Sequence, residues 1–330
     1  MDKSALSNIK TISIRNFKSV KSVTLSDCRR INVLIGRPNV GKSNILEALA
    51  LFDVPYMVNS SNKSLKNLLR IENTGDLFHN GVSSSPVEVS ADENSISVSR
   101  GSNNGLSVDI SINDDISKYS FSSSLILTTK KEPDVLPDIL AYFFPRHFTS
   151  ESSNVGFLLP PAGTNLMETV ANMPELKENL AKLFHGYGLK MMFDAGSQQI
   201  KAMRENGLDM FLVPFSSLAD SLQRLIFYKA AIESNHNKTI CFEEPEAHTF
   251  PPYISNVVND IIASGSNQFF ITTHSPYVIS SLLESAGDDL AVFVVDMHEN
   301  STTVKRLTDS QLQEAYDNGM DMFYNLEAYL

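Results

Sequence analysis

The sequence contains little cysteine and no long hydrophobic run. Its two cysteines, Cys28 and Cys241, lie inside apolar stretches and outside any metal-type pair, which predicts buried thiols and a reducing, cytoplasmic location. No run of about eighteen apolar residues occurs, so we expect no membrane-spanning helix and no membrane partner. The opening residues, MDKSALSNIK, lack the apolar core of a secretion signal, so export is not expected either.

The sequence also lacks internal repeats and any heptad stretch longer than a few turns. Its 330 residues are 42% hydrophobic and 20% charged, which is the composition of an ordinary soluble globular protein. A chain of this length can bury a sizeable core and holds one large or two small domains.

The net charge of −11 is unevenly distributed along the chain. Residues 1–46 carry nine basic residues against Asp2 and Asp27, whereas residues 281–330 carry ten acids against two basic residues. An acidic protein binds DNA poorly unless its basic residues gather in one patch. The N-terminal segment could supply such a patch, but a solvated strand edge together with a phosphate site would explain the same charges. The nine basic residues are Lys3, Lys10, Arg15, Lys18, Lys21, Arg29, Arg30, Arg37 and Lys42.

The stretch INVLIGRPNVGKSNILEAL, residues 31–49, predicts a site for a nucleoside triphosphate. Residues 36–43 fit the pattern G-x-x-x-x-G-K-[ST] between an apolar strand and a helix with apolar residues at helical spacing. A loop that wraps phosphates points its backbone N–H groups inward, which requires glycine, and the following helix N-terminus adds partial positive charge. Lys42 is expected to reach the β- and γ-phosphates, and the Ser43 hydroxyl to ligate Mg²⁺. The predicted cofactors are therefore ATP and Mg²⁺.

Two acids follow an apolar segment in KTICFEEPE, residues 238–246. Open α/β sheets bind ligands at the carboxyl ends of their parallel strands. Glu243 is expected to hold Mg²⁺, directly or through water, and Glu244 to polarise the water that attacks the γ-phosphate. A solvated turn would also explain two acids at a strand end, but the phosphate loop favours the functional interpretation.

Two further segments carry polar residues where a structural element begins or ends. An apolar strand over residues 267–272 is followed by His274, thirty residues after Glu244, and a neutral imidazole there can hydrogen-bond the γ-phosphate or the attacking water. A lone histidine is more often structural, but this position favours function.

Residues Ser217 and Asp220 precede an amphipathic helix, and helix capping explains both without a nucleotide.

Outside these segments the patterning changes along the chain. Alternation predicts a strand pair over residues 9–26 beside the nucleotide-binding strand, and an antiparallel region with one wet face over residues 56–124. A helical pattern begins near residue 133, and Leu176, Leu180, Leu183 and Phe184 share the face of a helix that stops at Gly186. We further expect short strands at residues 189–194, 199–204 and 209–214, a helix from about residue 220, a strand over 290–295 and a terminal helix over 311–330.

Taken in order, these segments resemble the heads of ABC-class ATPases of the SMC, RecF and OLD type. The resemblance covers both ends of the chain and is weak over residues 56–210. It rests on IRNFKSV (14–20), similar to the first-strand motif, GRPNVGKSNILEAL (36–49), similar to Walker A, SLADSLQRLIF (217–227), similar to the signature helix, FEEPEAH (242–248), similar to Walker B with its following loop, and ITTHSP (271–276), similar to the switch-histidine strand.

The resemblance implies an α/β fold, a P-loop NTPase head of the ABC type with a mixed sheet, an antiparallel β subdomain and a helical lobe. The whole chain, residues 1–330, would form one two-lobed head. Its nucleotide-binding core would be residues 1–55 and 205–330, its antiparallel β subdomain residues 56–130, and its helical lobe with short strands residues 131–204.

Such heads close on ATP as head-to-tail homodimers, with each ATP held between the Walker A loop of one subunit and the signature helix of the other. The resemblance implies Glu244 and His274 as catalytic residues, and Ser43 and Glu243 as metal ligands. The implied nucleotide-binding residues are Asn39, Gly41, Lys42, Ser43, Asn44, Ser217, Ser221 and Arg224.

The signature segment departs from the family pattern. Ala219 stands where these families often have serine, and Ser221 where they often have glycine, whereas Asp220 and Arg224 match. The missing hydroxyl removes one contact to the γ-phosphate, which predicts slow hydrolysis. Glu243 replaces the commoner aspartate, a longer reach to the metal.

Segment lengths favour one kind of function. The region between Ser43 and Ser217 leaves no room for long coiled-coil arms, and the residues after His274 are too few for the TOPRIM nuclease domain that OLD proteins append. We expect a stand-alone ATPase head that dimerises on ATP and controls a separate effector, a nuclease or toxin, in defence or DNA repair. The alternatives are a RecF-like DNA-binding repair ATPase and, with less support, a transporter's nucleotide-binding subunit or a P-loop kinase.

Overall fold

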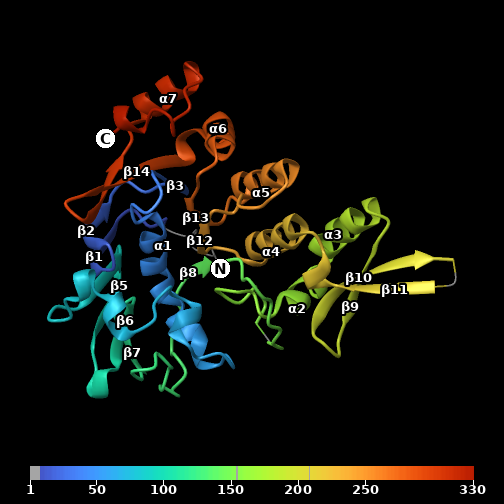
Figure 1. Ribbon diagram of the computed structural model, residues 1–330, viewed down its shortest axis with the longest axis horizontal. Coiled ribbons are helices and arrows are strands. Elements are labelled where there is room, and N and C mark those ends of the chain that lie inside the picture. Colours follow the sequence, from blue (N-terminus) through green and yellow to red (C-terminus); the bar gives the residue numbers. More distant parts are fainter. Residues whose placement is uncertain (1–7, 154, 208) are drawn as a thin grey trace, which may run out of the picture. The chain divides into compact units, whose positions relative to one another are not determined.

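The computed structural model describes residues 8–153, 155–207 and 209–330 (Figure 1). Asp2 and Lys3, which enter the N-terminal charge count, lie outside the described residues. The chain divides into two compact units, each assembled from segments that are far apart in the sequence. Unit 1 comprises the residues up to Ala141, Asn237–Glu244 and Ser266–Leu330, and unit 2 comprises Tyr142–His236 and Pro245–Gly265.

A largely parallel sheet of strand order β15-β14-β3-β13-β12-β8 forms the centre of unit 1. Strands β12, β13, β3 and β14 run parallel, and β15 pairs antiparallel with β14. Every residue of β3 and β13 is buried, as expected of strands covered on both faces. The strands are β3 (Ile31–Ile35), β8 (Ile139–Tyr142), β12 (Thr239–Glu243), β13 (Gln268–Thr272), β14 (Leu290–His298) and β15 (Ser301–Arg306).

An antiparallel sheet of order β2-β1-β4-β5-β6-β7 forms the second layer of unit 1. Buried apolar residues alternate with more exposed polar ones along its strands, so one face packs into the core and the other meets solvent. This confirms the alternation read from the sequence. The strands are β1 (Ile12–Phe17), β2 (Val20–Leu25), β4 (Val87–Ala91), β5 (Asn94–Arg100), β6 (Leu106–Ile112) and β7 (Asp115–Phe121).

Two expectations for this region are corrected by the structure. The strand pair expected beside the nucleotide-binding strand exists as β1 and β2, but β1 pairs with β4, so the pair belongs to the antiparallel sheet. The antiparallel region begins at Val87 rather than at residue 56, because the preceding residues form short 3-10 turns. Pro55 lies inside the first of these turns, η1 (Leu51–Val58), and its missing N–H is unsuited to a strand ladder.

Helices α1 (Lys42–Ala50), α6 (Pro276–Ser285) and α7 (Asp309–Asp317) complete unit 1. Helix α1 follows β3, as the apolar spacing after residue 42 predicts, and α6 follows β13. The terminal helix expected over residues 311–330 is wrong in length. Helix α7 ends at Asp317 because Gly319 adopts a φ of +58°, and the chain then continues in turns, including η8 (Leu326–Ala328).

Unit 2 combines helices with an antiparallel sheet of order β11-β10-β9. The predicted helix face is confirmed for Leu176, Leu180 and Phe184, which are buried in α3. The helical pattern expected from about residue 133 starts later, at Leu166, because residues 139–142 form β8. The elements are α2 (Leu166–Ala171), α3 (Pro174–Gly186), β9 (Lys190–Asp194), β10 (Gln199–Asn206), β11 (Asp209–Pro214), α4 (Asp220–Ser234) and α5 (Pro251–Ala263).

Both cysteines are buried and free, as the sequence predicts. Among the helices of the described residues, none is both long enough and apolar enough to cross a bilayer.

Asp53, in the turn after α1, is a carboxyl group buried in the core of unit 1. The Ala141 N–H donates to its Oδ2 at 2.9 Å, and its Oδ1 has no hydrogen-bond partner among the described residues. Burial raises the pKa of Asp53 well above its usual value, with the Ala141 hydrogen bond acting in the opposite direction. The folded protein therefore favours the neutral carboxyl group.

This burial predicts a pH-dependent stability. The pKa of Asp53 is higher in the folded than in the unfolded state, so its stabilising contribution is present at low pH. The contribution is lost as pH rises toward the folded pKa, at up to about 1.4 kcal/mol per pH unit. Asp53→Asn removes the ionisable group, so its free energy of unfolding should fall less between about pH 5 and about pH 7 than that of the wild type. Urea unfolding at both pH values measures this fall in the free energy of unfolding. A fall of the same size in Asp53→Asn and in the wild type would contradict the prediction.

Candidate functional site

The ends of three parallel strands lie in register at one edge of the unit 1 sheet. Glu243, the last residue of β12, pairs with Thr272, the last residue of β13, and Thr272 pairs with Leu34 near the end of β3. The segments that follow these strands carry the residues singled out in the sequence. The phosphate-type loop, the second acid and the histidine therefore emerge side by side, at the edge where parallel α/β sheets bind their ligands.

The loop after β3 has the backbone conformation that a phosphate cradle requires. Gly36 and Gly41 have φ values of +154° and +103°, which side-chain-bearing residues rarely adopt. A Cβ on Gly36 would lie 2.1 Å from the Val295 carbonyl oxygen, and one on Gly41 would lie 2.1 Å from Thr302 Oγ1. No side chain caps the N-terminus of α1, so its first N–H groups face the loop without a side-chain acceptor.

Lys42, at the first position of α1, turns back into this loop. Its Nζ donates to the carbonyl oxygens of Gly36 at 2.9 Å and of Arg37 at 2.7 Å, and the side chain is buried. Burial lowers the pKa of Lys42 to about 8, and the Glu244 carboxylate opposes this change. The ammonium group thus lies inside the loop, held by weak neutral acceptors that an anionic phosphate can replace.

Glu244 lies directly after β12 with a strained backbone. Its φ is +41°, and its N–H donates to the Thr272 carbonyl at 3.0 Å and to Thr272 Oγ1 at 3.2 Å. Non-glycine residues in this region cost about 1–3 kcal/mol and cluster at functional sites. The strain turns the side chain toward the next strand end, where its carboxylate approaches His274 Nε2 at 3.5 Å.

His274 is solvent-exposed and lies among the charged groups of the site. Burial lowers its pKa, the Lys42 charge lowers it further, and the Glu244 carboxylate acts in the opposite direction. The ring of Phe323 lies nearby, with the two ring centroids 6.5 Å apart. The lowered pKa favours the neutral imidazole, which has one nitrogen that donates a hydrogen bond and one that accepts.

Charged residues that were not identified from the sequence connect the first acid to the rest of unit 1. The Arg70 guanidinium forms an ion pair with Glu243 and lies 3.9 Å from Glu47. Glu47, buried in α1, also accepts from the Lys18 ammonium and from the Arg70 N–H. In the sequence, Glu47 stands among the apolar residues of the predicted helix, and this was the one available sign of a buried charge. Its partners could not be predicted, because they depend on how the residues near Lys18 and Arg70 pack against α1.

A second group of residues supports the loop from outside. The Asn44 amide donates to Ser19 Oγ at 2.7 Å, and Ser19 Oγ lies 2.7 Å from Thr302 Oγ1. The Thr302 hydroxyl in turn donates to the Val40 carbonyl at 2.9 Å. Asn44, expected to bind the nucleotide, thus links the start of α1 to β15 and to the turn between β1 and β2. Asn39 lies exposed in the loop with a φ of +62°, and Ser43 is half-buried in the first turn of α1.

The signature segment lies in unit 2, where its polar residues have local partners. Ser221 Oγ donates to the His248 carbonyl at 3.1 Å and accepts from the Phe250 N–H at 3.1 Å. Arg224 pairs with Asp220 at 3.0 Å and stacks 4.3 Å above the Phe144 ring. These contacts hold the segment and the loop that follows β12 together within unit 2.

The capping role expected for Ser217 and Asp220 is wrong. Ser217 belongs to the 3-10 turn η6 (Phe215–Ser217), and Asp220 is already the first residue of α4. Ala219 takes the N-cap position, and no side chain caps the helix. The N-terminus of α4 therefore keeps N–H groups without a side-chain acceptor.

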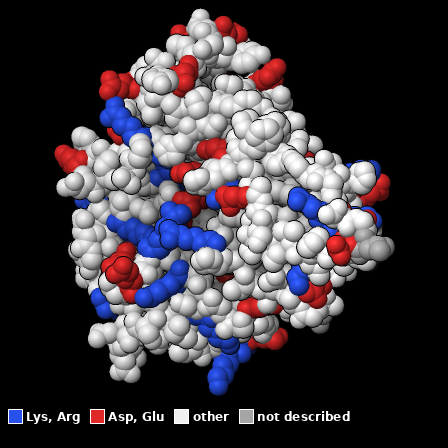
Figure 2. Space-filling view, turned by 45° about the vertical axis from the view of Figure 1, so that its right-hand side comes forward, with Lys and Arg blue, Asp and Glu red and all other residues white. Residues whose placement is uncertain are grey.

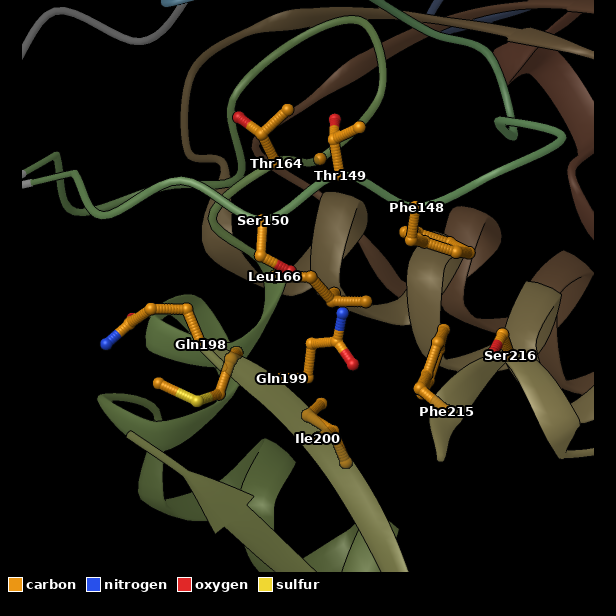
Figure 3. Close-up of a pocket in the computed structure, with 12 residues that line it drawn as sticks. Phe148, Thr149, Ser150, Thr164, Leu166, Gln198, Gln199, Ile200, Phe215 and Ser216 are labelled. Carbon is orange, nitrogen blue, oxygen red and sulfur yellow. The ribbon is translucent and has the colours of Figure 1, made fainter. Parts of the chain in front are cut away.

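Unit 2 also contains a small cavity of about 80 Å³ beside the signature segment. Figure 3 shows the rings of Phe148 and Phe215 on one side and the Gln199 amide pointing into the space. Ligand pockets usually measure about 300–1,000 Å³, so this cavity is suited to a few water molecules rather than a nucleotide.

The basic N-terminal residues do not form an isolated patch. Figure 2 shows basic side chains gathered near the middle of the visible face, with acidic side chains directly beside them. Several of the basic residues pair with acids of the C-terminal segment, so the two opposite charge excesses along the sequence partly neutralise each other. These pairs are Arg29–Asp309 at 2.6 Å, Arg30–Asp289 at 2.8 Å and Arg37–Glu327 at 2.7 Å, while Arg15 pairs with Glu88 and Lys18 with Glu47.

The site suits a metal that arrives with a phosphate ligand. No group of three or more histidine, cysteine, aspartate or glutamate residues in the described parts of the chain is placed to hold an ion alone. The Ser43 hydroxyl and the Glu243 carboxylate offer oxygen donors of the kind that Mg²⁺ prefers, and Mg²⁺ commonly binds through one or two carboxylates plus substrate phosphates. The glycine cradle and the donor set therefore fit a Mg²⁺–nucleotide complex.

Comparison with known sequence families agrees with this geometry. The family described as "AAA domain, putative AbiEii toxin, Type IV TA system" matches residues 31–280, which include the phosphate loop, both acids and the histidine. The chain belongs to this family. It is therefore an AAA-type ATPase domain, a class of protein that binds nucleotides.

Curated relatives match short segments of the chain. An uncharacterized protein of Methanocaldococcus jannaschii is 48% identical over 44 residues, 13% of this chain and 20% of that protein. An "ATP/GTP phosphatase" of Helicobacter pylori is 36% identical over 63 residues, 19% of this chain and 16% of that protein. The chain thus spans a fifth or less of the length of the curated relatives that it matches.

Solved structures define the fold more completely. The SMC head in a crystal structure with the C-winged helix domain of ScpA aligns with a TM-score of 0.51 at 14% identity, covering 92% of this chain and 99% of that one. At this identity the similarity shows the fold alone. The expected fold class, an ABC-class ATPase head of the SMC type, is confirmed.

The charges around His274 predict opposite effects of two substitutions. Lys42→Ala removes a neighbouring positive charge and should raise the pKa of His274, whereas Glu244→Gln removes the opposing negative charge and should lower it. NMR titration of the His274 ring-proton signal measures both shifts. The signal is assigned to His274 because it is absent in His274→Gln. Shifts of the same sign in the two variants would contradict the arrangement.

Proposed function

We propose that the chain is an ATP-driven switch that hydrolyses Mg²⁺–ATP, pairs with a second copy across the nucleotide, and controls a separate effector. The observation that carries the proposal is the convergence of Lys42, Glu243, Glu244 and His274 at one edge of the unit 1 sheet. The family assignment supports the ATPase part of the proposal.

The chain's own residues suggest how hydrolysis proceeds. Backbone N–H groups of the loop and of the α1 N-terminus bind the phosphates, and Lys42 exchanges its two carbonyl acceptors for phosphate oxygens. Mg²⁺ held by Ser43 and Glu243 would neutralise negative charge on the phosphates. Glu244 then accepts a hydrogen bond from the attacking water and takes its proton. The neutral His274 has a single N–H, which donates a hydrogen bond to the γ-phosphate, and its other ring nitrogen can accept one from the attacking water.

Dimerisation would supply the missing contacts from a second copy. The N-terminus of α4 lacks a side-chain cap, and such a terminus attracts a phosphate group. Ser217, Ser221 and Arg224 belong to this segment, and we propose that they complete the site of the partner copy. ATP then joins the two copies, and hydrolysis releases them.

The effector proposed for this chain fits the family's description as a putative AbiEii toxin of a type IV TA system, since such a system pairs two components. A role in such a conflict or defence system fits an ATP switch that acts on a nuclease-like or toxin-like partner. The RecF-like alternative receives less support, because basic residues such as Arg29 and Arg30 are already paired with acids. Salt-sensitive DNA binding by the purified chain would favour that alternative.

The loop assignment predicts that Lys42→Ala abolishes ATP binding. The substitution removes the one ammonium group held inside the loop by the Gly36 and Arg37 carbonyls. Isothermal titration calorimetry with Mg²⁺–ATP should show binding for the wild type and for Lys66→Ala, an exposed lysine outside the site, and none for Lys42→Ala. Unchanged affinity in Lys42→Ala would contradict the assignment.

The role of Glu244 predicts a trapped dimer. Glu244→Gln keeps the side-chain shape but removes the proton acceptor, so turnover should fall about 10²–10⁴-fold while ATP binding persists. Sedimentation velocity should then show a dimer with ATP and less dimer without it. Glu299→Gln, at an exposed acid elsewhere in unit 1, is the matched control and should hydrolyse ATP normally. Normal hydrolysis by Glu244→Gln would remove Glu244 from the mechanism.

A further inference from the structure

Strand β11 presents an uncovered apolar edge at the end of the unit 2 sheet. It is the last strand in the order β11-β10-β9, and no strand among the described residues pairs with its outer side. Met210, Phe211 and Leu212 are 69%, 55% and 55% exposed. In Figure 1 the β10–β11 hairpin extends beyond the end of α3. Exposed apolar edge strands readily pair with another strand, and natural proteins normally protect them.

The hairpin geometry determines which backbone groups point outward. Asn206 pairs with Asp209 across a two-residue turn that contains Gly207 at a φ of +64°. In a two-residue hairpin the closing pair is hydrogen-bonded, and hydrogen-bonded and non-hydrogen-bonded pairs then alternate along the ladder. Phe211 therefore directs its N–H and C=O toward β10. Met210 and Leu212 direct theirs outward, to the open edge.

This outward pattern is complementary to itself. If a second β11 runs antiparallel with the two Phe211 residues opposite each other, Met210 of each copy lies opposite Leu212 of the other. Both of those residues have outward N–H and C=O groups, so each pair exchanges two hydrogen bonds, and the ladder is satisfied on both strands. Pro214 has no N–H and lies just outside this ladder, where it costs no hydrogen bond.

Side chains and charges on the sheet also favour a second copy over a charged partner. The nearby lysines are already paired within the sheet, Lys190 with Glu205 at 2.6 Å and Lys201 with Asp194. No like charges would lie opposite each other in the symmetric pairing. The contact would consist of apolar pairs, with Phe211 against its own copy at the two-fold axis.

We propose that β11 pairs with β11 of a second copy of this chain, so that the two three-stranded sheets join into one sheet across a two-fold axis. The interface uses backbone hydrogen bonds and apolar side chains and makes no use of ATP. It is therefore distinct from the proposed nucleotide-dependent contact. Because the pairing joins only a few residues of each strand, we expect it to be weak and transient.

A cysteine at the two-fold position tests the pairing. At a non-hydrogen-bonded pair the two Cα atoms lie about 4.5 Å apart, within the range that a disulfide bridges. Phe211→Cys should therefore form a covalent dimer under mild oxidation, and the native cysteines will not interfere because both are buried. Ile116→Cys, at a 65% exposed apolar residue of β7, is the control and should give roughly tenfold less dimer.

The same experiment in a Lys42→Ala background without nucleotide separates this contact from the ATP-dependent one. Phe211→Cys should still cross-link in the Lys42→Ala background, even if the Glu244→Gln protein forms no ATP-dependent dimer. Sedimentation equilibrium should show a concentration-dependent dimer for the nucleotide-free protein. This dimer should be lost in Phe211→Glu, because that substitution places two carboxylates opposite each other. Equal cross-linking of the two cysteine variants would overturn the proposal, as would a nucleotide-free protein that stays monomeric and binds other proteins through β11.

Discussion

The parallel pairing of β12, β13 and β3 is the constraint on which the rest of the site depends. Because Glu243 pairs with Thr272 and Thr272 with Leu34, three strands end at the same level of one sheet. The residues after those ends then share one small region without long side chains having to reach across the fold. Sheet register, rather than any single contact, brings together a phosphate loop, two acids and an imidazole.

Close contacts around the phosphate loop hold it in place at this edge of the sheet. The second glycine of the loop leaves room for Thr302, whose hydroxyl binds the Val40 carbonyl, and Ser19 links the same threonine to Asn44. Residues from β15 and from the turn between β1 and β2 thus hold the loop from outside. Inside the loop the Lys42 ammonium binds two backbone carbonyls, so a phosphate exchanges existing hydrogen bonds instead of ordering a free side chain.

The sequence predicted those parts of the site that follow buried strands, because an apolar run ending in polar residues marks a strand end by itself. Glu243, Glu244 and His274 were predicted in this way, and Lys42 from the glycine spacing of residues 36–43. The Arg70–Glu243 pair was not predictable, since 173 positions separate the two residues and only the folded sheet brings them together. The prediction that Ser217 caps α4 is wrong because Ser217 belongs to a 3-10 turn that precedes the helix. Residue propensity alone does not distinguish a helix cap from a short turn before the helix.

In the proposed function, a triphosphate binds in the loop after β3 with its terminal phosphate beside the ends of β12 and β13. A crystal structure of the Glu244→Gln protein grown with Mg²⁺–ATP tests it most directly. In that crystal, Lys42 Nζ should leave the Gly36 and Arg37 carbonyls for phosphate oxygens, with Glu243 and His274 flanking the γ-phosphate. A triphosphate bound elsewhere, with Lys42 still on its two carbonyls, would contradict it.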